Sequence, residues 1–251
     1  STHEAELLYA SGFQSMVDAT PTGLGRDPAG LARISAATGL SILATTGAHR
    51  EDQYGTSHWL LEQTAAQLAG RFAADIQLGI PARDEPTGSQ PALSPTAKPV
   101  RAGVLKAGIG YWSITAFERR VLDAVADAHA RTGAPVMVHL EYGSAAWEVL
   151  DLLAKSGVEA SSVVLAHIDR NPDPGLHAEL AAHGAYLGYD GAARHKSWPD
   201  SVVLSCLLEV ARRGAGDRVG LGGEVAAPPR RLASCGVPGR ACRALMGRWQ
   251  V

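Results

Sequence analysis

Short apolar runs and amphipathic segments alternate along most of this chain. Seven runs rich in aliphatic and β-branched residues are bounded by turn-forming residues, which is typical of buried β-strands. These predicted strands cover residues 15–20, 41–46, 103–107, 136–140, 163–168, 185–189 and 218–222. Because their apolar positions are nearly continuous rather than alternating, they predict a parallel sheet.

The segments between the strands carry apolar residues at helical spacing. The clearest helix covers 116–131, begins with a capping box formed by Thr115 and Glu118, and places Phe117 and Val121 on one face. Other helices are predicted at 29–38, 57–74, 145–155, 175–183 and 200–213, with a helix-like segment at 5–10. Glycines that end helices in the left-handed conformation are expected at Gly39, Gly133, Gly157, Gly184 and Gly214. Alternation of this kind predicts an α/β fold whose sheet is covered on both faces or closed into a barrel.

The length of 251 residues suits one barrel-sized domain covering 1–251. One segment, 81–101, holds five prolines and almost no periodicity. Since the same alternation of strands and helices continues on both sides of it, we interpret this segment as a surface excursion and not as a linker between domains.

Composition and charge exclude several classes of protein. The formal net charge is −2, and lysines and arginines are scattered, which argues against a nucleic-acid partner. No apolar run approaches the roughly 20 residues that span a bilayer, and no signal pattern begins the chain. Three cysteines without C-x-x-C spacing, Cys206, Cys235 and Cys242, indicate a reducing compartment and packing roles. These observations predict a cytoplasmic protein that acts on a small molecule.

Three predicted strands carry a basic side chain near their carboxyl ends, where parallel α/β folds build their sites. Lys106 interrupts an apolar run, and a buried lysine requires a partner. His139 and His167 end the next two strands. A structural ion pair is the alternative for Lys106, and a hydrogen-bonded core position is the alternative for each histidine.

A buried lysine beside histidines is suited to metal binding. Its neutral amine, favoured by burial, can react with carbon dioxide to form a carbamate, which is an anionic ligand that bridges two divalent metals. His139 and His167 would bind one metal, most simply zinc, through neutral imidazole nitrogens. Glu224, two residues after the last predicted strand, is in the right place to supply a carboxylate that completes the site. A metal-activated hydroxide would be the nucleophile.

Other polar residues near strand ends are less specific. Arg194 lies in a basic loop after the sixth strand and is a candidate substrate contact, although a solvated loop explains it equally well. Asp190 either lines the site or caps a helix. The remaining histidines, among them His49 and His177, are interpreted as surface or packing residues. A dinucleotide fingerprint is absent, because Arg26-Asp27-Pro28 follows Gly23-Leu24-Gly25 and leaves Pro28 where the third glycine would be required.

Five motifs in order resemble the phosphotriesterase family of the amidohydrolase superfamily. They are Val17-Asp18-Ala19-Thr20-Pro21 with Gly25-Arg26-Asp27-Pro28, Ala44-Thr45-Thr46-Gly47, the run from Ala102 to Gly108, Thr132-Gly133-Ala134-Pro135-Val136 with His139, and Ala166-His167-Ile168-Asp169. The resemblance covers about residues 5–239. It implies a TIM-type (β/α)8 barrel in which carboxylated Lys106 bridges two metals and His139 and His167 bind the more exposed one. Members of the family hydrolyse phosphotriesters, lactones or, in some branches, N-acyl amides and other esters.

Two departures from the family pattern change what is expected. The His-x-His pair of the family's first strand is not found in this sequence, so that strand is expected to lie upstream of Ser1 or to be deleted. Glu224 stands where the family has an aspartate that ligates the buried metal and shuttles the proton, so the resemblance implies that Glu224 is a metal ligand and proton acceptor. We therefore expect at most one tightly bound metal. We also expect an incomplete barrel that either closes its gap with a rearranged N-terminal segment or covers its exposed edges by self-association. Two functions fit: a metal-dependent hydrolase of the phosphotriesterase or lactonase type, and a catalytically impaired scaffold that binds a small molecule.

Overall fold

The computed structural model describes residues 1–87, 89–192 and 198–222. In these ranges the chain forms one parallel sheet of seven strands, in which each strand pairs with the next one along the sequence. The strands are β1 (Ser15–Asp18), β2 (Ser41–Gly47), β3 (Ala102–Ile109), β4 (Val136–Leu140), β5 (Val163–Ala166), β6 (Tyr186–Tyr189) and β7 (Val219–Leu221). All seven predicted strands are confirmed, as is their parallel pairing.

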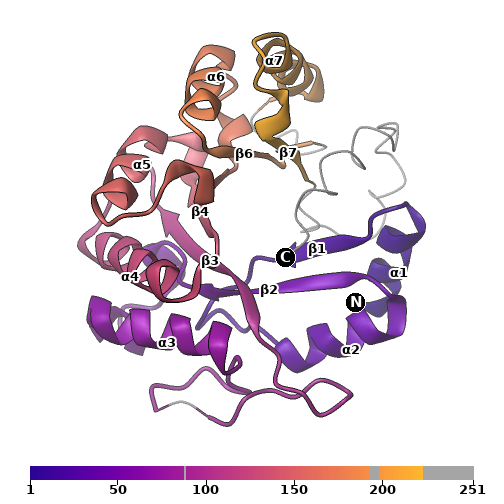
Figure 1. Ribbon diagram of the computed structural model, residues 1–251, viewed down its shortest axis with the longest axis vertical. Coiled ribbons are helices and arrows are strands. Elements are labelled where there is room, and N and C mark those ends of the chain that lie inside the picture. Colours follow the sequence, from indigo (N-terminus) through magenta and orange to yellow (C-terminus); the bar gives the residue numbers. More distant parts are fainter. Residues whose placement is uncertain (88, 193–197, 223–251) are drawn as a thin grey trace.

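The sheet curls into an arc, with helices along its outer side (Figure 1). Strands β1 and β7 are the two ends of the arc, and within the described ranges they do not pair with each other. Twist and stagger curl a parallel sheet, but a closed barrel needs enough strands to bring its two edges together. The described residues therefore show a seven-stranded half-barrel, and the complete (β/α)8 barrel remains a prediction.

The helices agree with the sequence prediction except at one start. They are α1 (Thr2–Ala10), α2 (Pro28–Thr38), α3 (Ala65–Gln77), α4 (Ala116–Thr132), α5 (Ala146–Lys155), α6 (Pro174–Ala182) and α7 (Asp200–Arg212). The predicted start of α3 at residue 57 is wrong, because Thr64 and Gln67 form a capping box that begins the helix at Ala65. The preceding apolar residues form a short 3-10 helix, Trp59–Glu62, in which Leu60 is fully buried. None of the helices described in the structure is long and apolar enough to cross a bilayer.

The main core lies between the sheet and the helices. Strand residues such as Leu105 and Val138 pack with Phe72 of α3 and with Phe117 and Val121 of α4, all of them fully or almost fully buried. The predicted face of α4 is thus confirmed, and α4 ends at Gly133 with a left-handed φ of 70°. Because alternate strand residues point to opposite faces, the other face of the sheet is left to carry polar side chains.

A buried ion cluster ties the loop after β1 to the rest of the protein. Arg26, whose side chain is 3% exposed, contacts Asp75 of α3 at 2.8 Å and Asp84 of the proline-rich segment at 2.7 Å. Its Nη1 donates to the carbonyl of Thr45 on β2, and Thr46 donates to Asp75. Burial raises the pKa of Asp75, and the charge of Arg26 opposes that rise.

The proline-rich segment 81–101 folds back on itself between α3 and β3. Short antiparallel bridges join Pro81 to Pro91 and Leu93 to Pro99, and the segment lies below α2 and α3 in Figure 1. Through Asp84 it reaches the buried Arg26, so part of this excursion belongs to the interior.

Candidate metal centre

Parallel pairing brings Lys106, His139 and His167 to the carboxyl ends of three neighbouring strands. Lys106 pairs with Met137 and Gly108 pairs with His139, so Lys106 and His139 point to the same inner face of the sheet. His139 pairs with Ala166, the residue before His167. All three predicted metal ligands of the described chain are nearly buried, with exposures of 3%, 7% and 5%.

Each histidine is held by a carboxylate, an arrangement typical of metal-binding histidines. The Nε2 of His139 lies 2.8 Å from Glu141 Oε2, and the Nδ1 of His167 lies 2.6 Å from Asp190 Oδ1. The two ring centroids are 4.5 Å apart. Burial, followed by the charges of neighbouring basic groups, lowers the pKa of His139, which keeps this imidazole in the neutral form that binds metals.

Among the residues that the structure describes, none forms the ion pair that the structural interpretation of Lys106 requires. Within the described residues its Nζ makes no hydrogen bond or ion pair, although its side chain is almost fully buried. Burial lowers the pKa of Lys106 to about 8, and Asp190 partly opposes this shift. The amine is therefore poised to lose its proton near neutral pH.

His49, interpreted from the sequence as a surface or packing residue, lies beside the candidate ligands. Its ring centroid is 4.5 Å from that of His139, and its Nδ1 accepts a hydrogen bond from the Arg50 amide at 2.8 Å. Burial, with Lys106 next in size, lowers the pKa of His49 to about 3. Gly108 leaves room for this loop, since a Cβ there would lie 3.0 Å from the Arg50 nitrogen. The available signal was the position of His49 just after a strand.

Two aspartates, Asp190 and Asp169, make hydrogen bonds at the end of the site that contains His167. Asp190 contacts His167, so the structure favours its site-lining interpretation over a helix cap. Asp169 is 1% exposed and accepts a hydrogen bond from the Gly191 amide at 2.7 Å. Burial, together with the charge of Asp190, raises the pKa of Asp169 to about 6.

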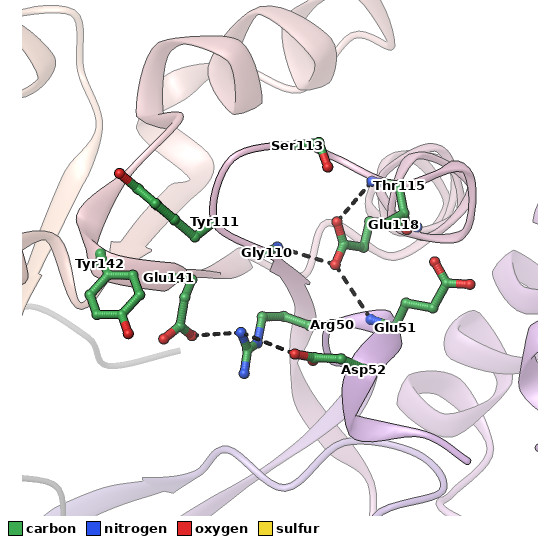
Figure 2. A pocket seen from close by; sticks show the side chains of 10 residues that line it. All are labelled: Arg50, Glu51, Asp52, Gly110, Tyr111, Ser113, Thr115, Glu118, Glu141 and Tyr142. Atoms are coloured by element: carbon green, nitrogen blue, oxygen red, sulfur yellow. Dashed lines mark hydrogen bonds and ion pairs between the residues drawn. The ribbon is translucent and has the colours of Figure 1, made fainter. Parts of the chain in front are cut away.

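A pocket of about 670 Å³ opens beside Glu141 (Figure 2). Its lining residues are Arg50, Glu51, Asp52, Gly110, Tyr111, Ser113, Thr115, Glu118, Glu141 and Tyr142. Arg50 contacts Glu141 at 2.9 Å and Asp52 at 3.4 Å. Because Glu141 also holds His139, the pocket wall and the candidate metal ligands share one carboxylate. Tyr111 and Tyr142, each more than half exposed, meet edge to face at 5.3 Å on one side of it.

Glu118 also lines this pocket. Its carboxylate accepts hydrogen bonds from the amides of Thr115 at 3.0 Å, Gly110 at 3.1 Å and Glu51 at 3.4 Å (Figure 2). The capping box foreseen from the sequence thus also fixes the loops that follow β2 and β3.

Replacing Glu118 with glutamine is expected to lower the free energy of unfolding by about 1–3 kcal/mol, because the amide NH2 faces backbone donors and leaves them unpaired. Urea denaturation measures the loss. Glu148→Gln is the control, since Glu148 occupies the same position in the first turn of α5 but is exposed. Equal stabilities of the two variants would show that the bonds of Glu118 contribute little.

Two predicted site residues, Arg194 and Glu224, lie outside the described residues. Within residues 1–87, 89–192 and 198–222, no three His, Cys, Asp or Glu side chains are grouped as ligands of one metal. The two histidines therefore need Lys106, or a ligand from elsewhere, to complete a metal site.

Known proteins resemble this chain over most of its length. The model of the phosphotriesterase family matches residues 2–237. The phosphotriesterase homology protein of Mycobacterium tuberculosis is 34% identical over 220 residues, which cover 84% of this chain and 62% of that protein. A phospho-furanose lactonase of Mycoplasmopsis synoviae is 27% identical over 219 residues, covering 85% and 61% of the two chains. This chain thus spans less than two thirds of the length of these relatives.

Solved structures show the same arrangement of strands and helices. A lactonase from Listeria monocytogenes superposes with a TM-score of 0.76 at 26% identity, covering 88% of this chain and 68% of that one. An amidohydrolase from Mycoplasma synoviae superposes with a TM-score of 0.79 at 25% identity, covering 88% and 63%. Because the family model matches nearly the whole chain, and a relative at 34% identity aligns with most of it, the chain belongs to the phosphotriesterase family.

Proposed function

We propose that this protein is a metal-dependent hydrolase of the lactonase type, in which Lys106, as its carbamate, His139 and His167 hold one divalent cation. One observation carries the proposal: a buried lysine without a partner in the described residues lies beside two histidines that carboxylates orient. A structural lysine at this depth would be expected to have an acceptor.

The donor atoms suit a zinc-like cation. Glu141 occupies the Nε2 of His139 and Asp190 occupies the Nδ1 of His167, so metal binding falls to the Nδ1 of His139 and the Nε2 of His167. With a pKa of about 8, roughly a tenth of Lys106 is neutral at pH 7 and able to react with carbon dioxide. Glu224 remains the proposed fourth ligand and proton acceptor.

A divalent cation in this position would make a water molecule nucleophilic near neutral pH and would polarise the carbonyl or phosphoryl oxygen of a substrate. The residues of the chain itself orient the metal-binding side chains. Glu141 fixes the ring of His139 and is itself held by Arg50. The adjoining pocket is large enough for a small ester, and Tyr111 and Tyr142 offer apolar contact at its side. Arg194 remains a proposed substrate contact.

A lactone is the substrate class that the relatives support, since two of them are named lactonases. Metal analysis of the purified protein, with a screen against a lactone, an aryl phosphotriester and an aryl ester, tests the proposal. We expect at most one tightly bound metal per chain and slow hydrolysis of the lactone, well below about 10 per second. Two metals per chain would contradict the single site. A bound metal with no turnover of any substrate would favour the alternative, an impaired scaffold.

Glu141→Gln is expected to weaken zinc binding about 10- to 100-fold, because the carboxylate that orients His139 is lost. Isothermal titration of the metal-free protein measures this. Asp52→Asn is the matched control, since Asp52 also contacts Arg50 but does not touch His139. A similar affinity in the two variants would mean that Glu141 acts only through the charge of the pocket.

A further inference from the structure

A buried hydrogen-bond chain that the proposed chemistry does not use ends at the turn after His167. His177 of α6 is fully buried, and its Nε2 lies 3.1 Å from the carbonyl oxygen of Ile168. Its Nδ1 is hydrogen-bonded to the hydroxyl of Tyr189 on β6, and the Sγ of Cys206 on α7 lies 3.4 Å from the same hydroxyl. We call Tyr189, His177 and the Ile168 carbonyl the supporting chain.

The direction of these bonds follows from their partners. A carbonyl oxygen only accepts, so the Nε2 of His177 must carry a proton. Burial lowers the pKa of His177, which keeps the ring neutral and leaves Nδ1 as an acceptor. Tyr189 donates to Nδ1 at the shorter of its two contacts, while the Cys206 Sγ lies 3.4 Å from the Tyr189 hydroxyl and 3.5 Å from Nδ1. The bond from Nε2 to the Ile168 carbonyl thus holds the imidazole in one tautomer.

The turn that receives this chain needs external support. His167 has a left-handed backbone with φ 65° and ψ 22°, which costs about 1–2 kcal/mol for a residue other than glycine. The turn closes when the amides of Arg170 and Asn171 donate to the carbonyls of His167 and Ile168. On its other side lies Gly143, where a Cβ would come within 2.9 Å of the Ile168 oxygen.

We propose that His177 and Tyr189 are positioning residues, which hold the Ile168 carbonyl and thereby fix the backbone that presents His167 to the metal. The inference rests on the proposed function, in which His167 is a metal ligand. Neither residue touches the metal or the substrate. They act on His167 only through the peptide that follows it.

The test compares Tyr189→Phe and His177→Leu with Leu180→Ala. Leu180 is also fully buried on α6, one turn beyond His177, but its aliphatic side chain takes no part in the hydrogen bonds of the supporting chain. In metal-free protein, hydrogen exchange of the Arg170 and Asn171 amides reports the turn directly. Zinc titration reports the presentation of His167.

We expect both supporting-chain variants to speed exchange at these amides and to weaken zinc binding about tenfold, with the larger effect in His177→Leu. Leu180→Ala should lower overall stability without either local effect.

Exchange rates and zinc affinities equal to those of Leu180→Ala would overturn the proposal and leave the supporting chain as core packing. If His177→Leu does not fold, Tyr189→Phe decides, because it removes a single oxygen atom. If the unaltered protein binds no zinc, the proposed function fails, and hydrogen exchange alone then decides whether the supporting chain holds the turn.

Discussion

Replacing Lys106 with methionine is expected to abolish tight metal binding and, with it, all hydrolytic activity. Methionine fills a similar volume in the apolar run of β3 but cannot form a carbamate, so of the described ligands only His139 and His167 would be left. Elemental analysis of the purified variant measures the loss. Lys98→Met is the control, because Lys98 is an exposed lysine of the proline-rich segment.

A second experiment tests whether zinc binding requires the carbamate of Lys106 or only its amine. Protein that is stripped of metal and kept free of carbon dioxide should bind zinc poorly, and added bicarbonate should restore binding in the unaltered protein but not in Lys106→Met. Metal content that is unchanged in Lys106→Met would show that the lysine is structural and that the ligands lie elsewhere.

Arg26→Met is expected to cause the largest loss of stability, about 3–5 kcal/mol, since it leaves a buried carboxylate without its counter-charge. Asp75 is 2% exposed, and Arg26 and Thr46 are the groups that bind its carboxylate in the structure. Urea denaturation at pH 7 measures the effect. Arg131→Met provides the contrast, because the exposed pair of Arg131 with Asp127 should contribute no more than about 1 kcal/mol.

The same variant should depend on pH in a defined direction. Burial already raises the pKa of Asp75, and removing Arg26 removes the charge that opposes this rise. The folded state then binds a proton more tightly than the unfolded state, so stability falls as pH rises through the pKa of the folded protein. Arg26→Met should therefore regain part of its stability in mildly acidic buffer. A loss that is independent of pH would indicate that packing of the Arg26 side chain, and not charge, supports the cluster.

The sequence predicted the sheet well because the strands of a parallel sheet are buried on both faces and therefore consist of uninterrupted apolar runs. The start of α3 was misplaced because Trp59 and Leu60 are apolar for tertiary reasons, packing a 3-10 helix onto the core, and this pattern imitated a helical face. Closure of the barrel depends on which strand edges meet, and the periodicity of single segments carries no information about that.

At the site, residues within strands were predictable and loop residues were not. Lys106 and His139 stand out because a basic side chain inside an apolar run is unusual. His49 lies in a loop, where the local sequence pattern does not distinguish a site histidine from a surface one. Its proximity to His139 follows only from the path of the chain after β2. The contacts of Arg26 with Asp75 and Asp84 link residues far apart in sequence, so no local sequence pattern predicts this cluster.

Pairing of each strand with its successor has a consequence for the order of folding. Ser15 pairs with Ser41 and Val164 with Tyr186, but Ala44 must find Ala102 across α3 and the proline-rich segment. Loop-closure entropy grows only logarithmically, so this longer span costs less than about 1 kcal/mol more than the others. Strand β1 can therefore pair with β2, and β3 with its successors through β7, before β2 and β3 join at this small additional cost.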